Sequence, residues 1–173
     1  MQITIRHEIP TDINDIHALE ADAFGCRLQA DIVDRLRDDG ALWLSQVALV
    51  NERIVGHAAY SLAEISQNSD KWRFPALGPI AVAPAKQRQG IGSALIRAGI
   101  EAVRDSGFGL LFLVGSPNYY PRFGFQPALP LGIGSDWVEP GGRHEHFMTL
   151  VLDPSLIGCV RGHLRFHPAF PDP

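Results

Sequence analysis

Residues 77–97 read Leu77-Gly78-Pro79-Ile80-Ala81-Val82-Ala83-Pro84-Ala85-Lys86-Gln87-Arg88-Gln89-Gly90-Ile91-Gly92-Ser93-Ala94-Leu95-Ile96-Arg97. The stretch begins as an apolar run, passes through a short basic loop, and continues with helical periodicity. Two glycines, Gly90 and Gly92, stand where the helix begins. The first N–H groups of a helix lack intrahelical acceptors and lie at the positive end of its dipole, so the stretch predicts a site for phosphate or another anion.

Taken alone, this loop has two interpretations. The Gly-Lys-Ser/Thr core of a Walker loop is absent, and Leu95 occupies the third glycine position of the dinucleotide-binding fingerprint. A surface turn that needs two glycines for tight turning would look the same. The residues by themselves therefore leave an anion site and a plain turn open.

Two motifs resemble a known family. Gln87-x-x-Gly90-x-Gly92, just after an Ile-Ala-Val strand, resembles the Gln/Arg-x-x-Gly-x-Gly/Ala signature of the GCN5-related N-acetyltransferase (GNAT) superfamily. The segment Asn118-Tyr119-Tyr120-Pro121-Arg122-Phe123-Gly124-Phe125 resembles the family's Tyr-x-x-x-Gly-Phe element. The ending Arg165-Phe166-His167-Pro168-Ala169-Phe170 resembles a bacterial subgroup of acetyltransferases of the YhbS type.

The resemblance implies an architecture. We expect an α/β GNAT fold with a mixed, mostly antiparallel central sheet of about six to seven strands. In the family this sheet is splayed between its two central parallel strands and is flanked by about four helices. We expect residues 1–153 to form one acetyltransferase domain and residues 154–173 to be a C-terminal tail packed on it.

The resemblance also implies a cosubstrate, acetyl-coenzyme A, and the residues that hold it. In the family, the strand before the loop pairs its free backbone groups with the pantetheine arm, and the loop amides hold the pyrophosphate. The matching positions for pantetheine are Ile80, Ala81 and Val82. Those for pyrophosphate are Gln87, Arg88, Gln89, Gly90, Ile91, Gly92 and Ser93.

The candidate general acid is Tyr120, four residues before Gly124. It matches the family tyrosine that protonates the departing coenzyme A thiolate. A phenol with an ordinary pKa of about 10 is protonated at neutral pH and can donate to a thiolate. The alternatives are an aromatic ring that only packs, or the neighbouring Tyr119 in the catalytic role.

Attack by an amine also requires a base or a proton-accepting water. Glu64 and His57 are the candidates, on a strand predicted over residues 54–65, and we predict Glu64 as the base. No motif fixes either residue. A strand glutamate that is merely solvated is the alternative.

Seven histidines raise the question of a metal site. His144 and His146 would share one face of a strand, and His163 and His167 are four residues apart. Such clusters can bind zinc, but no complete ligand set is specified. We therefore expect no metal.

Composition limits the partners. The chain has 173 residues and a net charge of −4, without a basic block, which disfavours nucleic acid as a partner. No apolar run reaches the roughly 20 residues of a membrane span. Two distant cysteines, Cys26 and Cys159, do not suggest a disulfide framework, and we expect a cytoplasmic protein without membrane contact.

Periodicity and turn residues predict the remaining elements. Strands are predicted over residues 3–7, 42–50, 54–65, 77–82, 109–114 and 146–152, and helices over 13–23, 29–38 and 90–105. Ser66 to Pro75 is polar and predicts a loop. Ser116-Pro117 predicts the start of a short helix that Pro121 would end. The stretch from Ala128 to Gly142 predicts an irregular excursion.

The function that these features predict is direct transfer of an acetyl group from acetyl-coenzyme A to a primary amine. The acceptor could be a small molecule, a peptide or a protein. The alternatives are a non-catalytic coenzyme A-binding regulatory or interaction module, and a binder of nucleotide phosphates. A homodimer stays open, because nothing in the sequence fixes the oligomeric state.

Overall fold

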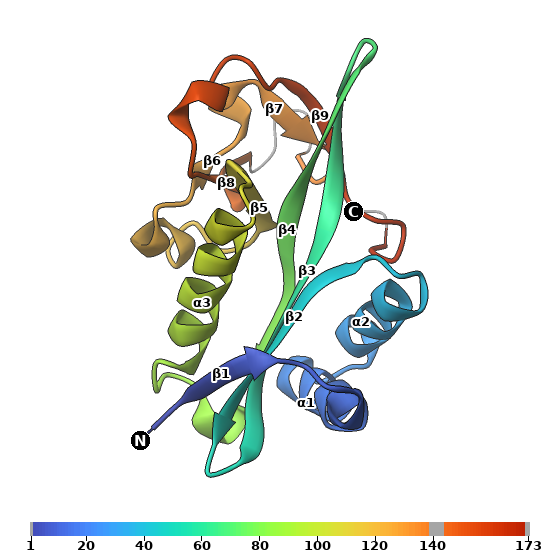
Figure 1. Ribbon diagram of the computed structural model, residues 1–173, viewed down its shortest axis with the longest axis vertical. Coiled ribbons are helices and arrows are strands. Elements are labelled where there is room, and N and C mark those ends of the chain that lie inside the picture. The colour runs from blue at the N-terminus through green and yellow to red at the C-terminus, as the bar shows by residue number, and fades with distance from the viewer. Residues whose placement is uncertain (1, 139–143, 172–173) are drawn as a thin grey trace. The chain divides into compact units, whose positions relative to one another are not determined.

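The computed structural model describes residues 2–138 and 144–171. These ranges contain three α-helices and nine strands, so the predicted α/β class is confirmed. The helices are α1 (Ile13–Phe24), α2 (Leu28–Asp38) and α3 (Ile91–Asp105) (Figure 1). The strands are β1 (Thr4–His7), β2 (Leu42–Val50), β3 (Arg53–Gln67), β4 (Asp70–Val82), β5 (Leu110–Val114), β6 (Gln126–Pro127), β7 (Ile133–Ser135), β8 (Phe147–Val151) and β9 (Gly162–Arg165).

The counts differ from the prediction of six to seven strands and about four helices. The three strands outside the six predicted ranges, β6, β7 and β9, have two to four residues, too few for a periodic signal to appear in the sequence. The remaining helical segments are single 3-10 turns, at Pro10–Asp12, Pro84–Lys86, Tyr120–Phe123, Leu129–Leu131, His144–His146 and Pro154–Leu156. Of the described helices, none has the length and apolar character that a membrane span requires.

The chain forms two compact units, and β3 and β4 run through both. Unit 1 comprises Met1–Ser61 and Leu77–Ala102, and unit 2 comprises Leu62–Ala76 and Val103–Pro173. The sheet order is β1-β2-β3-β4 in unit 1 and β3-β4-β5-β8-β6 in unit 2. Each unit has its own hydrophobic core and is described separately below.

In unit 1, helices α1 and α2 lie side by side and cover the sheet (Figure 1). Their apolar stripes meet the sheet in one buried cluster, which contains Ile16, Val33, Val47 and Ala59. The amphipathic spacing that predicted both helices is therefore explained by this contact. Just before α1, the Asp12 carboxylate accepts from the N–H of Ile9 and makes no cap hydrogen bond to α1.

The β2–β3 hairpin closes through Asn51 and Glu52. Both residues have positive φ, 50° and 62°, the conformation of the tight turns that match strand twist. The register then shifts between Ala48 and Leu49, which leaves one extra residue on β3 beside Gly56. This irregularity is a β-bulge, a place where glycine is common in strands.

Unit 2 is built around aromatic rings in its sheet. Phe112 on β5 is fully buried, with Phe74 of β4 at 6.1 Å and Phe147 of β8 at 5.9 Å between ring centroids. These contacts explain why residues 110–113 are continuously apolar and buried, as in a strand that is covered on both faces. Strand β9 pairs antiparallel with β3 and parallel with β7, so the segment after residue 153 contributes a strand to this sheet.

The predicted loop at Ser66 to Pro75 is wrong. Strand β3 continues to Gln67 and β4 begins at Asp70, so only Asn68 and Ser69 form the turn of a long hairpin, visible as the extended ribbon of β3 and β4 in Figure 1. Asn68 takes the left-handed conformation, with φ of 54°. Paired strands obtain their hydrogen bonds from the backbone, so polar side chains do not prevent this ribbon from forming.

The short helix predicted from Ser116-Pro117 also needs correction. The 3-10 turn spans Tyr120–Phe123, and Pro121 lies in its first turn instead of ending it. Ser116 still organises the approach, since its carbonyl accepts from the N–H groups of Tyr119 and Tyr120. Of the predicted irregular stretch, residues 128–138 hold a 3-10 turn and β7, and residues 139–142 lie outside the described ranges.

Candidate functional site

The end of β4 leads directly into the glycine-bearing loop of unit 1. Its last residues, Ile80 to Val82, alternate between half-buried and buried positions. The N–H of Ala83 donates to the carbonyl of Val55 at 2.9 Å, which fixes the end of β4 to β3. A 3-10 turn, Pro84–Lys86, then redirects the chain toward α3. The Gly78–Pro79 peptide bond is cis.

Two residues of the loop adopt the left-handed conformation. Arg88 has φ of 59° and Gly90 has φ of 86°. Glycine reaches this region without steric cost, whereas a residue with a Cβ does so uncommonly. An arginine held in this conformation indicates that the loop has a defined shape. Its side chain is exposed.

The main-chain N–H groups of residues 88–92 are available to a ligand. None of them donates to an acceptor in the described parts of the chain, residues 2–138 and 144–171. The first helical hydrogen bond after the loop runs from the N–H of Ala94 to the carbonyl of Gly90, at 2.9 Å. The N–H groups just before it lie at the positive end of the α3 dipole, where an anion is stabilised.

The two glutamines of the loop brace its backbone. Gln87 Nε2 donates to the Val82 carbonyl at 3.1 Å, and Gln89 Nε2 donates to the Ala85 carbonyl at 3.2 Å. Both glutamine amides therefore donate to backbone carbonyl groups of this segment, and they form these hydrogen bonds without a ligand. The glutamine of the motif acts in this structure as a support for the loop.

Gly56 of β3 sets how closely α3 approaches the sheet. A Cβ at this position would lie 2.9 Å from Ile91 Cγ2, 3.0 Å from Leu95 Cδ1 and 3.3 Å from the carbonyl oxygen of Ala81. Ile91 and Leu95 form the buried first turn of α3, next to the loop. The missing side chain thus lets the first helical turn and the end of β4 meet β3.

In unit 2, Tyr120 is held by glycine and aromatic neighbours. Its ring lies so close to Gly115 that a Cβ there would be 2.2 Å from Tyr120 Cε2. The rings of Tyr119 and Phe125 pack edge-on against it, with centroids at 5.2 and 5.9 Å. The Arg122 guanidinium instead stacks over Tyr119, 4.5 Å from its ring centroid. Tyr120 is therefore held in one orientation, which suits either a packing or a proton-donating role.

Burial raises the pKa of Tyr120 from 10.0 to about 12, with a smaller contribution from Tyr119. Above pH 10 an unfolded tyrosine loses its proton while folded Tyr120 keeps it, so this residue lowers stability as pH rises toward 12. At pH 10.0 the wild-type protein and Tyr120→Phe should give the same tyrosinate absorbance in an ultraviolet titration. A deficit of half a tyrosinate in the variant would show that the phenol is not shielded.

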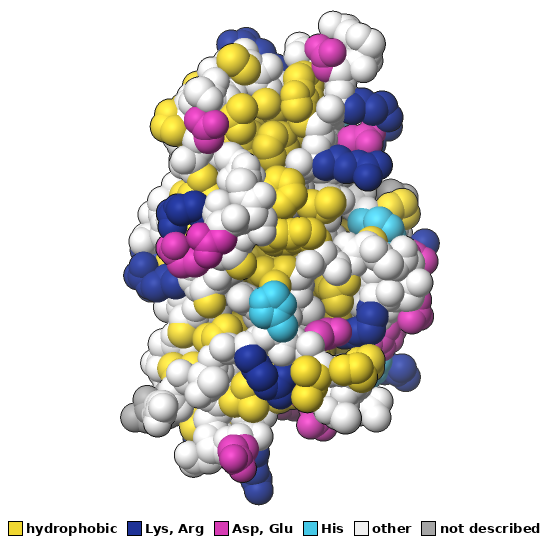
Figure 2. All heavy atoms as spheres, in the orientation of Figure 1, with side chains coloured by type: hydrophobic (Ala, Val, Ile, Leu, Met, Phe, Trp, Pro, Cys, Tyr) yellow, Lys and Arg dark blue, Asp and Glu magenta, His cyan; other side chains and the backbone are white. Residues whose placement is uncertain are grey.

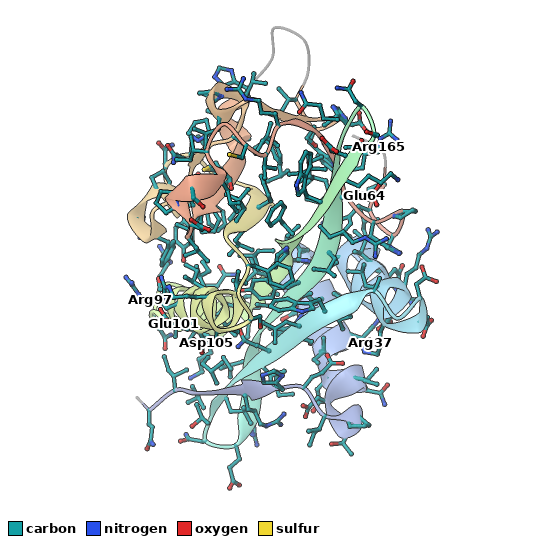
Figure 3. The ribbon with its side chains drawn as sticks, turned by 45° about the horizontal axis from the view of Figure 1, so that its top comes forward. Arg37, Glu64, Arg97, Glu101, Asp105 and Arg165 are labelled. Atoms are coloured by element: carbon teal, nitrogen blue, oxygen red, sulfur yellow. The ribbon has the colours of Figure 1, made fainter. Side chains whose placement is uncertain are left out.

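Glu64, the predicted base, lies on β3 in unit 2. Lys71 Nζ donates to its carboxylate at 2.9 Å, and Arg73 Nε lies 3.7 Å away. Arg165 of β9 is its cross-strand partner, as Figure 3 shows. The hydrogen bond from Lys71 and the two positive charges hold the pKa of Glu64 below its ordinary value. A carboxylate with a lowered pKa is a weaker base. These contacts therefore do not favour Glu64 as the general base, and that role stays a prediction.

His57, the other candidate base, is fully buried in unit 1. Its Nδ1 lies 2.6 Å from Glu20 Oε1 and its Nε2 lies 2.9 Å from Ser45 Oγ. A ring enclosed in this way cannot reach an amine directly. Sequence reasoning missed Glu20 and Ser45, because nothing in the pattern of α1 or β2 pairs them with His57.

The predicted histidine pairs do not form a metal site. His144 and His146 lie in a 3-10 turn instead of sharing one face of a strand. His163 pairs with Asp136 at 2.7 Å, and His167 Nδ1 accepts from the N–H of Ala169. Within the described residues, no group of three His, Cys, Asp or Glu side chains is placed to hold a metal ion.

Positively and negatively charged side chains are mixed on the face drawn in Figure 2. On the face in Figure 2, Lys and Arg are interspersed with Asp and Glu and form no extended basic patch. Nucleic-acid binding requires clustered positive charge. This face therefore offers no such site.

Comparison with known proteins identifies the family. Residues 4–128 match the model of the acetyltransferase (GNAT) domain. YjhQ of Escherichia coli K12, an uncharacterized N-acetyltransferase, is 38% identical over 119 residues, which cover 68% of this chain and 66% of YjhQ. YhbS of the same organism, also an uncharacterized N-acetyltransferase, is 30% identical over 167 residues, which cover 96% of this chain and 97% of YhbS.

Solved structures show the same similarity. The crystal structure of Escherichia coli YhbS in complex with CoA has a TM-score of 0.88 and 27% identity, covering 97% of this chain and 91% of YhbS. A GNAT family acetyltransferase from Brucella melitensis in complex with acetyl-CoA has a TM-score of 0.80 and 31% identity, covering 98% of this chain and 99% of that one. The resemblance noted from the loop and tyrosine motifs is thereby confirmed. The chain belongs to the GNAT family of acetyltransferases.

Proposed function

We propose that this chain transfers the acetyl group of acetyl-coenzyme A to a primary amine. The observation that carries the proposal is the row of N–H groups at residues 88–92, which donate to no acceptor in residues 2–138 and 144–171. The similar YhbS and Brucella melitensis structures, which hold CoA and acetyl-CoA, support the choice of ligand. A diphosphate is the part of coenzyme A that such a loop suits.

The loop and the strand before it bind different parts of the cofactor. The N–H groups of residues 88–92 bind the pyrophosphate, and Arg88 adds a positive charge. The backbone of Ile80 to Val82 binds the amide groups of the pantetheine arm. Because Gly90 and Gly92 lack side chains, the phosphate oxygens can approach the backbone closely.

The reaction needs one proton removed and one proton supplied. The neutral amine attacks the thioester carbonyl carbon, the C–N bond forms, and the C–S bond breaks as the tetrahedral intermediate collapses. Tyr120, protonated at neutral pH, donates its phenolic proton to the departing coenzyme A thiolate. The proton lost by the amine passes to water or to Glu64. The products are the acetylated amine and free coenzyme A.

Two measurements test this proposal. Calorimetry should detect acetyl-coenzyme A binding, and an amine panel should reveal release of free coenzyme A thiol. No binding at high micromolar protein would contradict the cofactor assignment. Binding without turnover across small amines, peptides and protein N-termini would instead favour the non-catalytic module.

Reversing the charge at Arg88 should weaken binding. Arg88→Glu places a negative charge beside the pyrophosphate, and we expect acetyl-coenzyme A affinity to fall at least about tenfold at low salt, the effect of about 1.4 kcal/mol. Because the term is electrostatic, the difference should shrink as ionic strength rises. Arg27→Glu is the control, since it changes the net charge equally at an exposed position outside the loop. Equal losses in both variants would contradict a local role for Arg88.

A side chain at Gly56 should disturb the loop by displacing the first turn of α3. Gly56→Ala pushes against Ile91 and Leu95, so we expect a stability loss of roughly 1–3 kcal/mol, typical of overpacking. Acetyl-coenzyme A affinity should fall several-fold because the first turn of α3 moves. The double variant Gly56→Ala/Ile91→Ala should lose less stability than the sum of the losses in the two single variants, because the smaller side chain at position 91 relieves the overpacking. Thermal unfolding of the four proteins of this double-mutant cycle measures the difference. Strictly additive losses would contradict the steric account.

A further inference from the structure

The last part of unit 2 forms a cavity that the proposed acetyl transfer does not use. The ending Arg165 to Phe170 carries the subgroup resemblance but has no part in that reaction. In the fold, this ending and Trp137, which follows β7, line a cavity of about 210 Å³. The residues that line it are separate from the loop at residues 87–93 and from Tyr120 and its aromatic neighbours.

A tight turn after β9 brings two aromatic rings together. The N–H of Phe170 donates to the carbonyl of His167 at 3.0 Å, and the N–H of Ala169 donates to His167 Nδ1 at 3.1 Å. Pro168 lies inside this turn, and its ring fixes its φ. Phe166 and Phe170 therefore meet across the turn, with ring centroids 5.7 Å apart.

The third ring comes from the segment after β7. Strands β7 and β9 are parallel, with Ser135 opposite Leu164. Ser135 Oγ accepts from the N–H of Trp137 at 3.3 Å, and the Ser135 carbonyl accepts from the N–H of Val138 at 2.9 Å. This turn brings the Trp137 indole edge-on to Phe166, with ring centroids 6.3 Å apart and planes at 84°. Two segments that are distant in the sequence thus supply one aromatic lining.

The three rings differ in how they are packed. Phe166 packs against the buried core cluster of unit 2 and lies edge-on to Phe147, with ring centroids 6.4 Å apart. Trp137 and Phe170 are only half-buried. Small-molecule sites are concave and are lined mainly by apolar and aromatic side chains, with a few polar groups that fix the orientation of the ligand. The rings therefore supply the apolar part of such a site.

The volume of the cavity limits the size of the ligand. An apolar cavity of about 150 Å³ takes up a benzene molecule. With about 210 Å³, this cavity has room for one aromatic ring that carries a short substituent. Coenzyme A and nucleotides are too large for it.

Two charged side chains, Asp136 and Arg165, also line the cavity. Asp136 Oδ1 lies 2.7 Å from His163 Nε2, so this carboxylate already has a partner. Arg165 is opposite Glu64 in the pairing of β9 with β3 (Figure 3), but the Glu64 carboxylate accepts from Lys71. Within the described part of the chain, Arg165 forms no ion pair of its own. The charge that is left for a ligand is therefore positive.

We propose that this cavity binds a small aromatic carboxylate. The ring of the ligand packs against Trp137, Phe166 and Phe170, and its carboxylate accepts hydrogen bonds from the Arg165 guanidinium. A guanidinium offers N–H donors in a fork that matches the two oxygens of a carboxylate. An organic cation would also suit the aromatic rings, but it would meet the positive charge of Arg165.

The test is a titration of the ¹⁵N-labelled protein, followed by NMR of the Trp137 indole N–H, the signal that is lost in Trp137→Phe. The probes are hydrocinnamate, its neutral amide hydrocinnamide, and the cation phenylpropylamine, which share one ring and chain. Hydrocinnamate should shift this signal saturably, with a Kd of about 1 mM or below, as expected for a ligand of this size. The amide and the amine should bind at least about tenfold more weakly, because they cannot accept charge-assisted hydrogen bonds from Arg165.

Three results of this titration would overturn the proposal. Equal affinity for the acid and the amide would show that Arg165 does not bind the carboxylate. Tightest binding of the amine would assign the cavity to organic cations. No saturation by hydrocinnamate up to about 10 mM would show that the cavity does not take this class of ligand.

Arg165→Gln should abolish the preference for the acid over the amide, a loss of about tenfold in affinity for hydrocinnamate. Arg161→Gln is the matched control. Arg161 is also exposed in unit 2, but its Nε donates to the Gly158 carbonyl at 3.1 Å and it does not line the cavity. The control removes the same charge and should keep the preference. Equal losses in the two variants would reduce the effect to overall charge and contradict the role of Arg165.

Phe170→Ala tests the aromatic lining. Because it removes one ring and no charge, affinity for the acid and the amide should fall by the same factor, about three- to tenfold. Unchanged affinity for both probes would contradict the placement of the ligand ring. Thermal unfolding checks that the variant is folded, and the Arg165 and Arg161 variants, at exposed positions, decide the proposal if it is not. These readouts do not involve coenzyme A, so failure here leaves the proposed acetyl transfer untouched.

Discussion

The Tyr120→Phe protein should turn over at least about 100-fold more slowly than the wild type, with unchanged affinity for acetyl-coenzyme A. General acid catalysis by a positioned side chain contributes roughly 10²–10⁴-fold in rate, and phenylalanine keeps the ring while removing the proton. The ring should still fill the space over Gly115 and against Phe125. Steady-state kinetics with any accepted amine, together with calorimetry of the cofactor, separates the two effects.

Tyr119→Phe is the control for this experiment. The two tyrosines are neighbours, with ring centroids 5.2 Å apart, so both variants remove one hydroxyl from the same aromatic cluster. The Tyr119 variant should keep turnover within a few-fold of the wild type. If Tyr119→Phe loses turnover and Tyr120→Phe does not, the acid is Tyr119 and the assignment is wrong.

Gly90→Ala should weaken acetyl-coenzyme A binding by about ten- to a hundredfold, the effect of losing one hydrogen bond to a charged group. Gly90 has φ of 86°, where a Cβ costs roughly 1–2 kcal/mol. Space is not the obstacle, because nothing lies within 4 Å of the added Cβ. The alanine should therefore turn the backbone and redirect the N–H groups of the loop. Calorimetry measures the affinity directly.

Gly107→Ala tests whether backbone strain alone produces that loss. Gly107 follows the other end of α3 with a similar φ of 79°, and its added Cβ also meets nothing within 4 Å. Both variants should lose similar stability in thermal unfolding. Only Gly90→Ala should lose cofactor affinity, and equal losses of affinity would show that the loop has no special role.

The loop could be predicted from sequence because its determinants are local. An apolar strand, two spaced glycines and a helix-forming run are consecutive, so their geometry follows from backbone preferences within about 20 residues. The left-handed conformation of Arg88 could not be predicted, since an arginine carries no preference for it. The bracing roles of Gln87 and Gln89 likewise appear only in the folded loop.

The β3–β4 ribbon was not predictable in the same way. Residues 66–75 are polar, and polarity usually marks a loop. The ribbon forms because each strand pairs with the other, and β9, almost a hundred residues later, pairs with Glu64 to Ser66 of β3. Such a nonlocal partner leaves no mark in the sequence of the strand.

The buried pair of Glu20 and His57 shows the same limit for side chains. Glu20 follows the helical pattern of α1 as an ordinary charged residue, and charged residues are almost never fully buried unless paired. Its partner lies 37 residues away on β3. Only the packing of α1 on the sheet brings the two together, so the sequence marked His57 as a candidate base and gave no reason to suspect Glu20.

The central claim is that the N–H groups after β4 hold a diphosphate, and a crystal structure with bound coenzyme A tests it most directly. We predict pyrophosphate oxygens at about 2.7–3.2 Å, hydrogen-bond distance, from at least two of the main-chain nitrogens of residues 88–92. A bound cofactor whose pyrophosphate lies elsewhere, with these N–H groups facing solvent, would contradict the account.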